Sequence, residues 1–205
     1  MADITIRPAT PEDAHLTAAL MYSSGPKAFD YVFANQQPEG SLDFLHWMFM
    51  QDKGMFSYRN HWVAEVDGKV LGLIGSFTKS TIDKGMLATS LGTIRYLGLI
   101  QGLKALAKGM RFEYQLVKPP KKDCLYIAHV GVTPESRGLG LGSKMIAHVE
   151  SLAREQGIGK LSLDVSVINP RAQQLYERLS FKVLGEQQSY TPDLDNHRYM
   201  EYLLS

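Results

Sequence analysis

The stretch "VGVTPESRGLGLGSKMIAHVE", residues 130–150, places three glycines at alternate positions directly before apolar residues of helical spacing. Gly138, Gly140 and Gly142 leave backbone N–H groups uncovered where the predicted helix begins. The helix dipole favours a phosphate group at that end, and Arg137 adds a cation beside it. The stretch therefore predicts a strand, an anion-binding turn and a helix. A glycine-rich turn without a ligand is the alternative.

Spacing excludes two nucleotide-binding motifs. A P-loop ends in Gly-Lys followed by Ser or Thr, whereas Ser143 precedes Lys144 here. A dinucleotide-binding fingerprint requires a third glycine at position 143 and an early βαβ unit. The glycine turn instead follows a hairpin, which Asp67 and Gly68 predict between the apolar runs "HWVAEV" and "KVLGLIGSF".

A second motif, "NPRAQQLYERLSF" at residues 169–181, begins about thirty residues after the glycine turn. The alternating run "KLSLDVSV" before it predicts a strand with one buried face. Asn169 is a preferred helix cap and Pro170 suits the first helical position. The helix is expected to bury one face, formed by Ala172, Leu175, Tyr176 and Leu179.

Together the two motifs resemble the acetyl-coenzyme A signature of the GNAT superfamily of N-acetyltransferases. The family pattern is Arg/Gln-x-x-Gly-x-Gly/Ala, followed by Asn-x-x-Ala-x-x-x-Tyr-x-x-x-Gly-Phe. Ser180 stands where the family prefers glycine. The resemblance implies a mixed α/β fold with a central, mostly antiparallel twisted sheet and helices on both faces. The residues that match are Arg137, Gly140, Gly142, Asn169, Ala172, Tyr176 and Phe181.

The resemblance also implies acetyl-CoA as cosubstrate and direct attack of a primary amine on its thioester. The pyrophosphate would lie on the backbone of residues 137–143, and the thioester carbonyl near the N–H of Val132. Tyr176 resembles the general acid that protonates the departing thiolate. The alternative is that Tyr176 is simply an aromatic residue of the hydrophobic core. The predicted cofactor-binding residues are Val130, Val132, Arg137, Gly138, Gly140, Gly142, Ser143, Asn169 and Tyr176.

The general base is not identified by the motifs. Many relatives carry Glu or His at the position of Ala128. Strand alternation predicts Tyr126 on the face of Ala128 and His129 on the opposite face, which favours a structural role for His129. Deprotonation through ordered water or by a residue of the 22–60 segment stays open. Tyr31, Phe33 and Trp47 are candidates to line the acceptor pocket.

Residues 79–122 differ from the rest of the chain, because they carry nine Lys or Arg and two acidic residues, a net charge of +7. The segment is predicted to be a basic helix or helix pair inserted in the domain. One interpretation is a surface that binds a partner or a membrane; the favoured one is an insert whose apolar face packs on the domain. That face comprises Leu87, Leu91, Ile94, Leu99, Leu103, Leu106 and Met110.

Length and composition favour one domain spanning residues 1–205, with 44% hydrophobic residues. Cys124 cannot form an internal disulfide and is expected to be a buried thiol in a cytoplasmic protein. We expect no transmembrane helix, because no uncharged apolar run reaches about 18 residues, and no metal site, because the six histidines are not paired with Cys, Asp or Glu at metal-ligand spacing. We expect no nucleic-acid partner, because the net charge is only +1. The expected partner is a small-molecule amine or peptide, and the resemblance also allows a homodimer. A coenzyme-A-binding module without catalysis is the alternative function.

Overall fold

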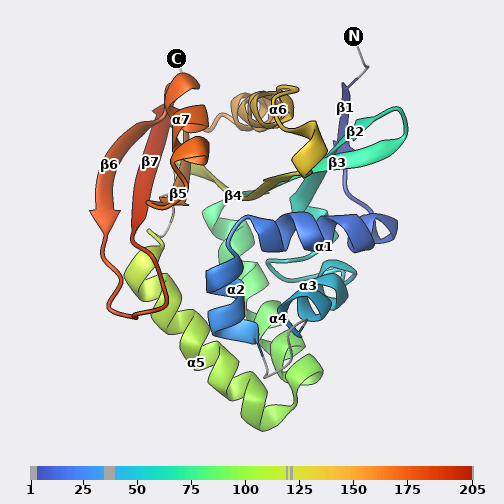
Figure 1. Cartoon of the computed structure of the whole chain (residues 1–205), viewed down its shortest axis with the longest axis vertical. Coiled ribbons are helices and arrows are strands. Elements are labelled where there is room, and N and C mark those ends of the chain that lie inside the picture. The colour runs from blue at the N-terminus through green and yellow to red at the C-terminus, as the bar shows by residue number, and fades with distance from the viewer. Residues whose placement is uncertain (1–3, 35–39, 119, 121, 205) are drawn as a thin grey trace.

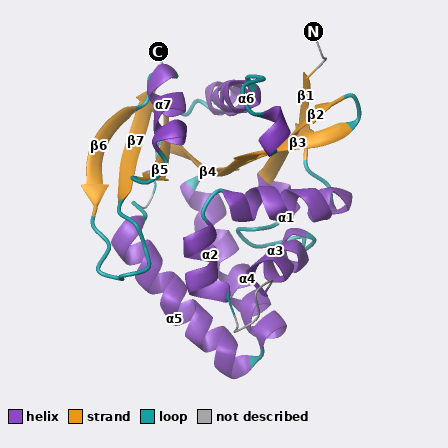
Figure 2. Cartoon of the chain, viewed as in Figure 1, coloured by secondary structure: helices purple, strands orange, loops and turns teal. Residues whose placement is uncertain are grey.

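The computed structural model describes residues 4–34, 40–118, 120 and 122–204. Figures 1 and 2 show strands at the centre and helices on both sides of them. The strands are β1 (Ile4–Pro8), β2 (His61–Val66), β3 (Lys69–Phe77), β4 (Cys124–Val132), β5 (Lys160–Ser166), β6 (Lys182–Gln187) and β7 (His197–Leu203). The α-helices are α1 (Ala14–Ser23), α2 (Pro26–Phe33), α3 (Gly40–Phe49), α4 (Lys79–Leu97), α5 (Leu99–Leu116), α6 (Leu141–Glu155) and α7 (Pro170–Arg178), with short 3-10 turns at Pro11–Asp13, Tyr58–Asn60 and Pro134–Ser136.

The strands form one sheet in the order β1-β2-β3-β4-β5-β7-β6. Among the described strands, only the β4–β5 pair is parallel, and the other neighbours are antiparallel. The predicted hairpin joins β2 and β3, and both of its turn residues have positive φ, 48° at Asp67 and 76° at Gly68. Such angles suit the tight turn of a two-residue hairpin. The predicted mixed and mostly antiparallel sheet is confirmed.

Two hydrophobic clusters cover the two faces of the sheet, as predicted. One joins α6 and α7 to the sheet, and Met145, Val149 and Tyr176 lie in it. The other joins α1, α2, α3 and part of α5 to the opposite face, and Phe44 and Leu73 lie in it. In Figure 1, α6 lies on one side of β4, and α1 and α2 lie on the other.

The 79–122 segment forms the predicted helix pair, α4 and α5, but the orientation predicted for its leucine-rich face is wrong. Five of the seven apolar side chains assigned to the buried face are more than half exposed: Leu87, Leu91, Leu99, Leu103 and Met110. No helix in the described part of the chain is long and apolar enough to cross a bilayer.

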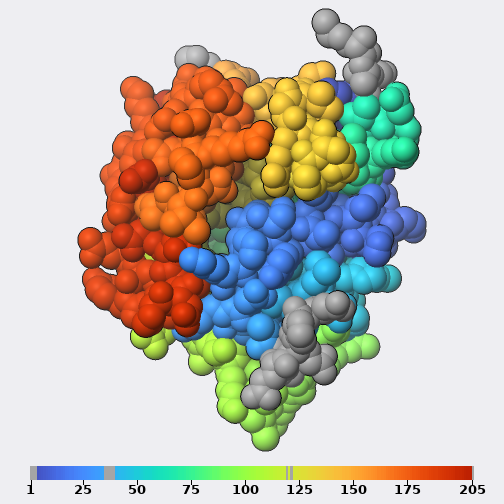
Figure 3. All heavy atoms as spheres, viewed as in Figure 1, coloured from blue at the N-terminus to red at the C-terminus, as the bar shows by residue number. Residues whose placement is uncertain are grey.

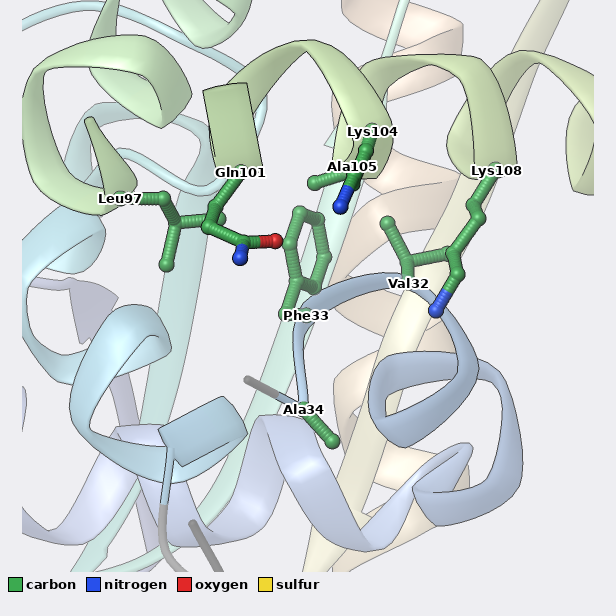
Figure 4. Close-up of a pocket in the computed structure, with 8 residues that line it drawn as sticks. All are labelled: Val32, Phe33, Ala34, Leu97, Gln101, Lys104, Ala105 and Lys108. Atoms are coloured by element: carbon green, nitrogen blue, oxygen red, sulfur yellow. The ribbon is translucent and has the colours of Figure 1, made fainter. Parts of the chain in front are cut away.

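Small residues of α4 and α5 form the packed face instead. A Cβ at Gly92 would lie 2.8 Å from the Met48 sulfur, and one at Gly102 would lie 2.7 Å from the Ile94 Cα. The buried Ala105 of α5 faces Phe33 at the end of α2 (Figure 4). Contacts this close, to a helix backbone at Gly102 and to a side chain at Gly92, leave no room for larger residues, and the leucines of the same helices point outward.

Candidate active site

The centre of the site is the place where β4 and β5 separate. The two strands pair at three positions, Cys124 with Lys160, Leu125 with Leu161 and Tyr126 with Ser162. Beyond them β5 continues along β7, while β4 continues along β3. One edge of β4 is therefore left without a partner strand, and a cavity of about 810 Å³ lies against it. In Figure 3 the surface is recessed between the orange C-terminal part, α6 in gold and the blue N-terminal helices.

Tyr176 lines this cavity from α7, where Asn169 caps the helix as predicted. The Asn169 carboxamide oxygen accepts a hydrogen bond of 3.1 Å from the Ala172 backbone N–H. Tyr176 is 7% exposed and its ring lies 5.8 Å from that of Phe181. Burial raises the pKa of Tyr176 to about 12, so its hydroxyl keeps its proton at neutral pH. Tyr176 is thus a core aromatic that also borders the cavity.

Ser180 explains why a glycine is preferred near the end of this motif. Its φ is 70°, in the left-handed region that follows the end of α7. A side chain is disfavoured there because its Cβ approaches the following carbonyl oxygen.

The glycine turn lies between β4 and α6, as predicted. Gly138 and Gly140 have φ values of 89° and 78°, and Gly140 caps α6. A Cβ at either position would meet nothing within 4 Å, so the left-handed backbone is what requires glycine there. Gly142 differs, because a Cβ there would lie 2.9 Å from a Leu175 methyl group, and it allows α6 to approach α7. Arg137 is exposed beside the turn.

A β-bulge in β4 corrects the prediction for His129. Leu73 pairs with Gly131 and Gly75 with Ala128, so three residue steps on β4 oppose two on β3. His129 takes up the extra residue with a φ of 56°. The bulge keeps its side chain on the face of Ala128, and both residues line the cavity. Simple alternation predicted the opposite face and was wrong.

The ring of His129 stacks on that of His61, with centroids 5.2 Å apart. His61 Nδ1 lies 2.7 Å from the Ser57 carbonyl oxygen, which can only accept, so His61 carries its proton on Nδ1. His61 Nε2 therefore accepts the 2.9 Å hydrogen bond from His129 Nδ1. Burial lowers the pKa of His61 to about 4, and burial together with His61 lowers the pKa of His129 well below its usual range. Both rings are neutral at pH 7.

Asp164 is a site residue that the sequence did not reveal. It follows the buried Leu163 on β5 and points to the opposite face, toward the cavity. Its Oδ2 accepts hydrogen bonds from the Lys118 backbone N–H at 3.2 Å and from the Tyr126 hydroxyl at 3.1 Å. Its Oδ1 is buried, with no hydrogen-bond partner among the described residues. Burial raises the pKa of Asp164 to about 7, although the two hydrogen bonds act in the opposite direction and lower it.

The signal for Asp164 was an acidic residue inside an alternating apolar strand, "LSLDVSV". The outcome for the other pocket candidates is mixed. Phe33 lines the large cavity, whereas Trp47 packs beside Tyr96 and Tyr31 lies 5.4 Å from the Lys108 ammonium. The buried thiol of Cys124 is confirmed; it is 1% exposed and donates a hydrogen bond to the Ser162 hydroxyl.

The site thus combines a sheet opened between its two parallel strands, a glycine turn at a helix start and a buried tyrosine beside the opening. The family model described as "Acetyltransferase (GNAT) family" matches residues 27–181. The chain therefore belongs to the GNAT acetyltransferase family.

Sequence relatives match only part of this chain. The 5-NmdU N-acetyltransferase of Pseudomonas phage PaMx11 is 42% identical over 57 residues, which are 28% of this chain and 39% of the phage protein. The thialysine N-epsilon-acetyltransferase of Bos taurus is 38% identical over 66 residues, 32% of this chain and 39% of the bovine protein. The matches thus cover about two fifths of each of these relatives.

Solved structures match the whole fold. The N-acetyltransferase of Staphylococcus aureus Mu50 has a TM-score of 0.73 and 23% sequence identity, and the match covers 97% of this chain and 100% of that one. A second acetyltransferase has a TM-score of 0.69 and 20% identity over 98% of this chain. These similarities show the fold.

Proposed function

We propose that the protein transfers the acetyl group of acetyl-CoA to a primary amine, with Asp164 as general base and Tyr176 as general acid. The observation that carries the proposal is that both side chains border one cavity, Asp164 from β5 and Tyr176 from α7. Acetyl transfer requires one group that accepts a proton from the amine and one that gives a proton to the thiolate.

The pKa values support these two roles. The pKa of Asp164 is raised to about 7 by burial, so a large fraction is ionised at neutral pH and the carboxylate can accept a proton. The pKa of Tyr176 is raised to about 12, so this group is protonated and available as a donor. Two groups whose pKa values differ in this way are suited to opposite roles in proton transfer.

The proposed reaction proceeds by direct attack. Asp164 first accepts one proton from the ammonium form of the acceptor, directly or through one water, and the neutral amine nitrogen then forms a bond to the thioester carbonyl carbon. The N–H of Val132 is our candidate donor to the oxygen that becomes negative in this step. The carbon–sulfur bond then breaks, the departing thiolate takes the proton of Tyr176, and the Tyr176 phenolate takes the second proton from the nitrogen as the amide forms.

Cofactor binding is proposed at the unpaired edge of β4 and at the glycine turn. The pantetheine arm would add to β4 near Val130 and Val132 as an extra strand does. Asn169 is our second polar contact for this arm, although its oxygen is also engaged in capping α7. The pyrophosphate would bind the backbone N–H groups of residues 137–143, with Arg137 and Ser143 beside it.

Thiol release from acetyl-CoA, measured over a panel of amines, peptides and aminoglycosides, tests the proposal. We expect turnover with at least one primary amine, and identification of the N-acetyl product by mass spectrometry. Acetyl-CoA binding measured by calorimetry is the parallel measurement. Binding without turnover on any amine would instead support the coenzyme-A-binding module without catalysis.

A further inference from the structure

We infer that the acceptor is a cationic primary amine carried on an apolar, preferably aromatic, stem and lacking a carboxylate or phosphate beside the amine. This inference rests on the proposed function and names the class of its acceptor. It concerns the part of the large cavity that faces away from α7.

The acceptor side of the cavity is mainly apolar. It is bordered by α2, the segment after α3, the start of α4 and the end of α5. Aromatic and sulfur-containing side chains supply most of this wall, and they are Phe29, Phe33, Met55, Phe56, Phe77 and Phe112. Aromatic rings bury a large area and favour flat or extended apolar groups. A polar stem such as a sugar would leave its hydroxyl groups without partners on this wall.

The charged groups of the wall are predominantly acidic, although the insert as a whole is basic. Asp83, Glu113 and Asp164 line the cavity. Among the described lining residues Lys79 is the one lysine or arginine, and its ammonium lies 2.9 Å from the Asp83 carboxylate. The other cations of α4 and α5 lie outside this lining. Outside the lining, the Lys118 ammonium lies over the Tyr199 ring, and its charge lowers the pKa of Asp164. Within the described lining an anionic group would meet no unpaired cation, so a cationic ligand is favoured.

Two buried acceptor atoms mark the place where the amine would bind. Asp164 Oδ1 and Ser166 Oγ are buried with no hydrogen-bond partner in the described structure, and both residues line the cavity. Buried polar atoms of this kind normally have a partner. An ammonium group offers three donors, and it would satisfy both atoms when bound.

Glu113 lies farther along the cavity, near the end of α5. Part of its side chain is in solvent, and its apolar surroundings raise the pKa of its carboxyl. It is placed to attract the ammonium group as the ligand enters. Met86 and Met110 are exposed and also line the cavity, so they provide apolar surface on the entry path.

A panel of matched acceptors tests the inference. L-Phenylalaninamide and L-phenylalanine differ at the carboxylate, and L-phenylalaninamide and L-alaninamide differ in the apolar stem. We expect kcat/KM for L-phenylalaninamide to exceed that for L-alaninamide by on the order of 10-fold to 100-fold. We expect a comparable preference, on the order of 10-fold or more, over L-phenylalanine. 2-Phenylethylamine and a peptide beginning with phenylalanine then show whether the stem belongs to a small molecule or to a peptide.

One substitution changes the charge preference specifically. Asp83→Asn leaves the Lys79 ammonium unpaired in the cavity wall, so the ratio of kcat/KM for L-phenylalaninamide to that for L-phenylalanine should fall by on the order of 10-fold. Lys84→Gln is the matched control, because Lys84 lies next in the same helix and does not line the cavity. The control should keep the wild-type ratio.

Equilibrium binding separates failure of this inference from failure of the proposed function. If no amine is turned over but L-phenylalaninamide still binds the CoA-loaded protein more tightly than the other two ligands, the inference stands and the catalytic proposal fails. If amines are turned over with no preference for the apolar cation, the inference is overturned and the catalytic proposal stands. Absence of selective binding together with absence of turnover overturns both.

Discussion

The Tyr126 hydroxyl donates a hydrogen bond of 3.1 Å to the Asp164 carboxylate, across the point where β4 and β5 separate. Tyr126 is the last residue of β4 that pairs with β5, and Asp164 lies two residues beyond the last paired residue of β5. The bond thus joins the end of the parallel pairing to the proposed base.

Tyr126→Phe should raise the pKa of Asp164 above its wild-type value of about 7, because the hydroxyl stabilises the ionised carboxylate. The acidic limb of the pH–rate profile should therefore move to higher pH, with little change at high pH. Tyr58→Phe removes a similar bond, from Tyr58 to Asp52 outside the cavity, and should leave the profile unchanged. An identical profile in Tyr126→Phe would show that Asp164 does not control the acidic limb.

Asp164→Asn should abolish most turnover and stabilise the protein. The folded-state pKa is raised, so keeping this group ionised in the native state costs free energy once the pH exceeds the unfolded-state pKa. Relative to wild type, the free energy of unfolding should be higher by on the order of 4 kcal/mol above pH 7, and nearly equal near pH 4. Denaturant titrations at these two pH values provide the measurement. If the variant were less stable than wild type at both pH values, the claim that the buried Asp164 carboxylate destabilises the native state would be wrong.

Tyr176→Phe should retain acetyl-CoA binding and lose on the order of 10² to 10⁴ in turnover, because it removes a general acid and keeps the ring. Tyr202→Phe is a matched control. Tyr202 packs on the same Phe181 ring, with centroids 5.5 Å apart, and does not line the cavity. Stopped assays with a thiol reagent measure turnover, and calorimetry measures binding. Equal turnover in the two variants would remove the assignment of Tyr176 as the acid.

Ser180→Gly should stabilise the protein by about 1 kcal/mol, since glycine adopts the left-handed conformation without the Cβ penalty. Thermal unfolding followed by circular dichroism measures the change. Ser180→Ala retains the Cβ and lacks the hydroxyl, so it should show no comparable gain. A stabilisation of equal size in Ser180→Ala would attribute the effect to the hydroxyl instead of the backbone.

The His61–His129 pair should make the fold sensitive to acid. The pKa of His61 is lowered to about 4 in the folded state, so the unfolded state binds more protons between roughly pH 6.5 and 4. The contribution of neutral His61 to the free energy of unfolding is complete above about pH 6.5 and is lost as the pH falls toward 4. At about pH 5 it should be reduced by about 2 kcal/mol. His61→Gln should flatten this dependence, whereas His15→Gln, at an exposed histidine, should preserve it.

Local features of the sequence predicted much of the fold. Asp67 and Gly68 predicted the hairpin because only certain residues adopt the required φ values, and Asn169 predicted the start of α7 through its side chain. Tyr176 was placed beside the opening by a motif. For the hairpin and the helix cap, the deciding interaction lies within a few residues of the chain.

The features that escaped prediction depend on distant residues. Nothing in "LYIAHVGV" marks the bulge, which arises from pairing with β3 and reverses the face expected for His129. Asp164 became a candidate base only when Tyr126 and Lys118 were found beside it. For α4 and α5, hydrophobic spacing predicted that the leucines are buried, whereas the packed positions are Gly102, which lies against the Ile94 backbone, and Gly92, which lies against the Met48 side chain.

The three residue pairs between β4 and β5 also have a thermodynamic consequence. They are the only direct strand pairing between β1–β4 and β5–β7 in the described sheet. A ligand that occupies the opening and contacts both groups of strands binds the native state and not the unfolded chain. Its binding free energy is therefore added to the free energy of unfolding of both groups of strands. The unfolding temperature of each group should rise as the ligand concentration increases.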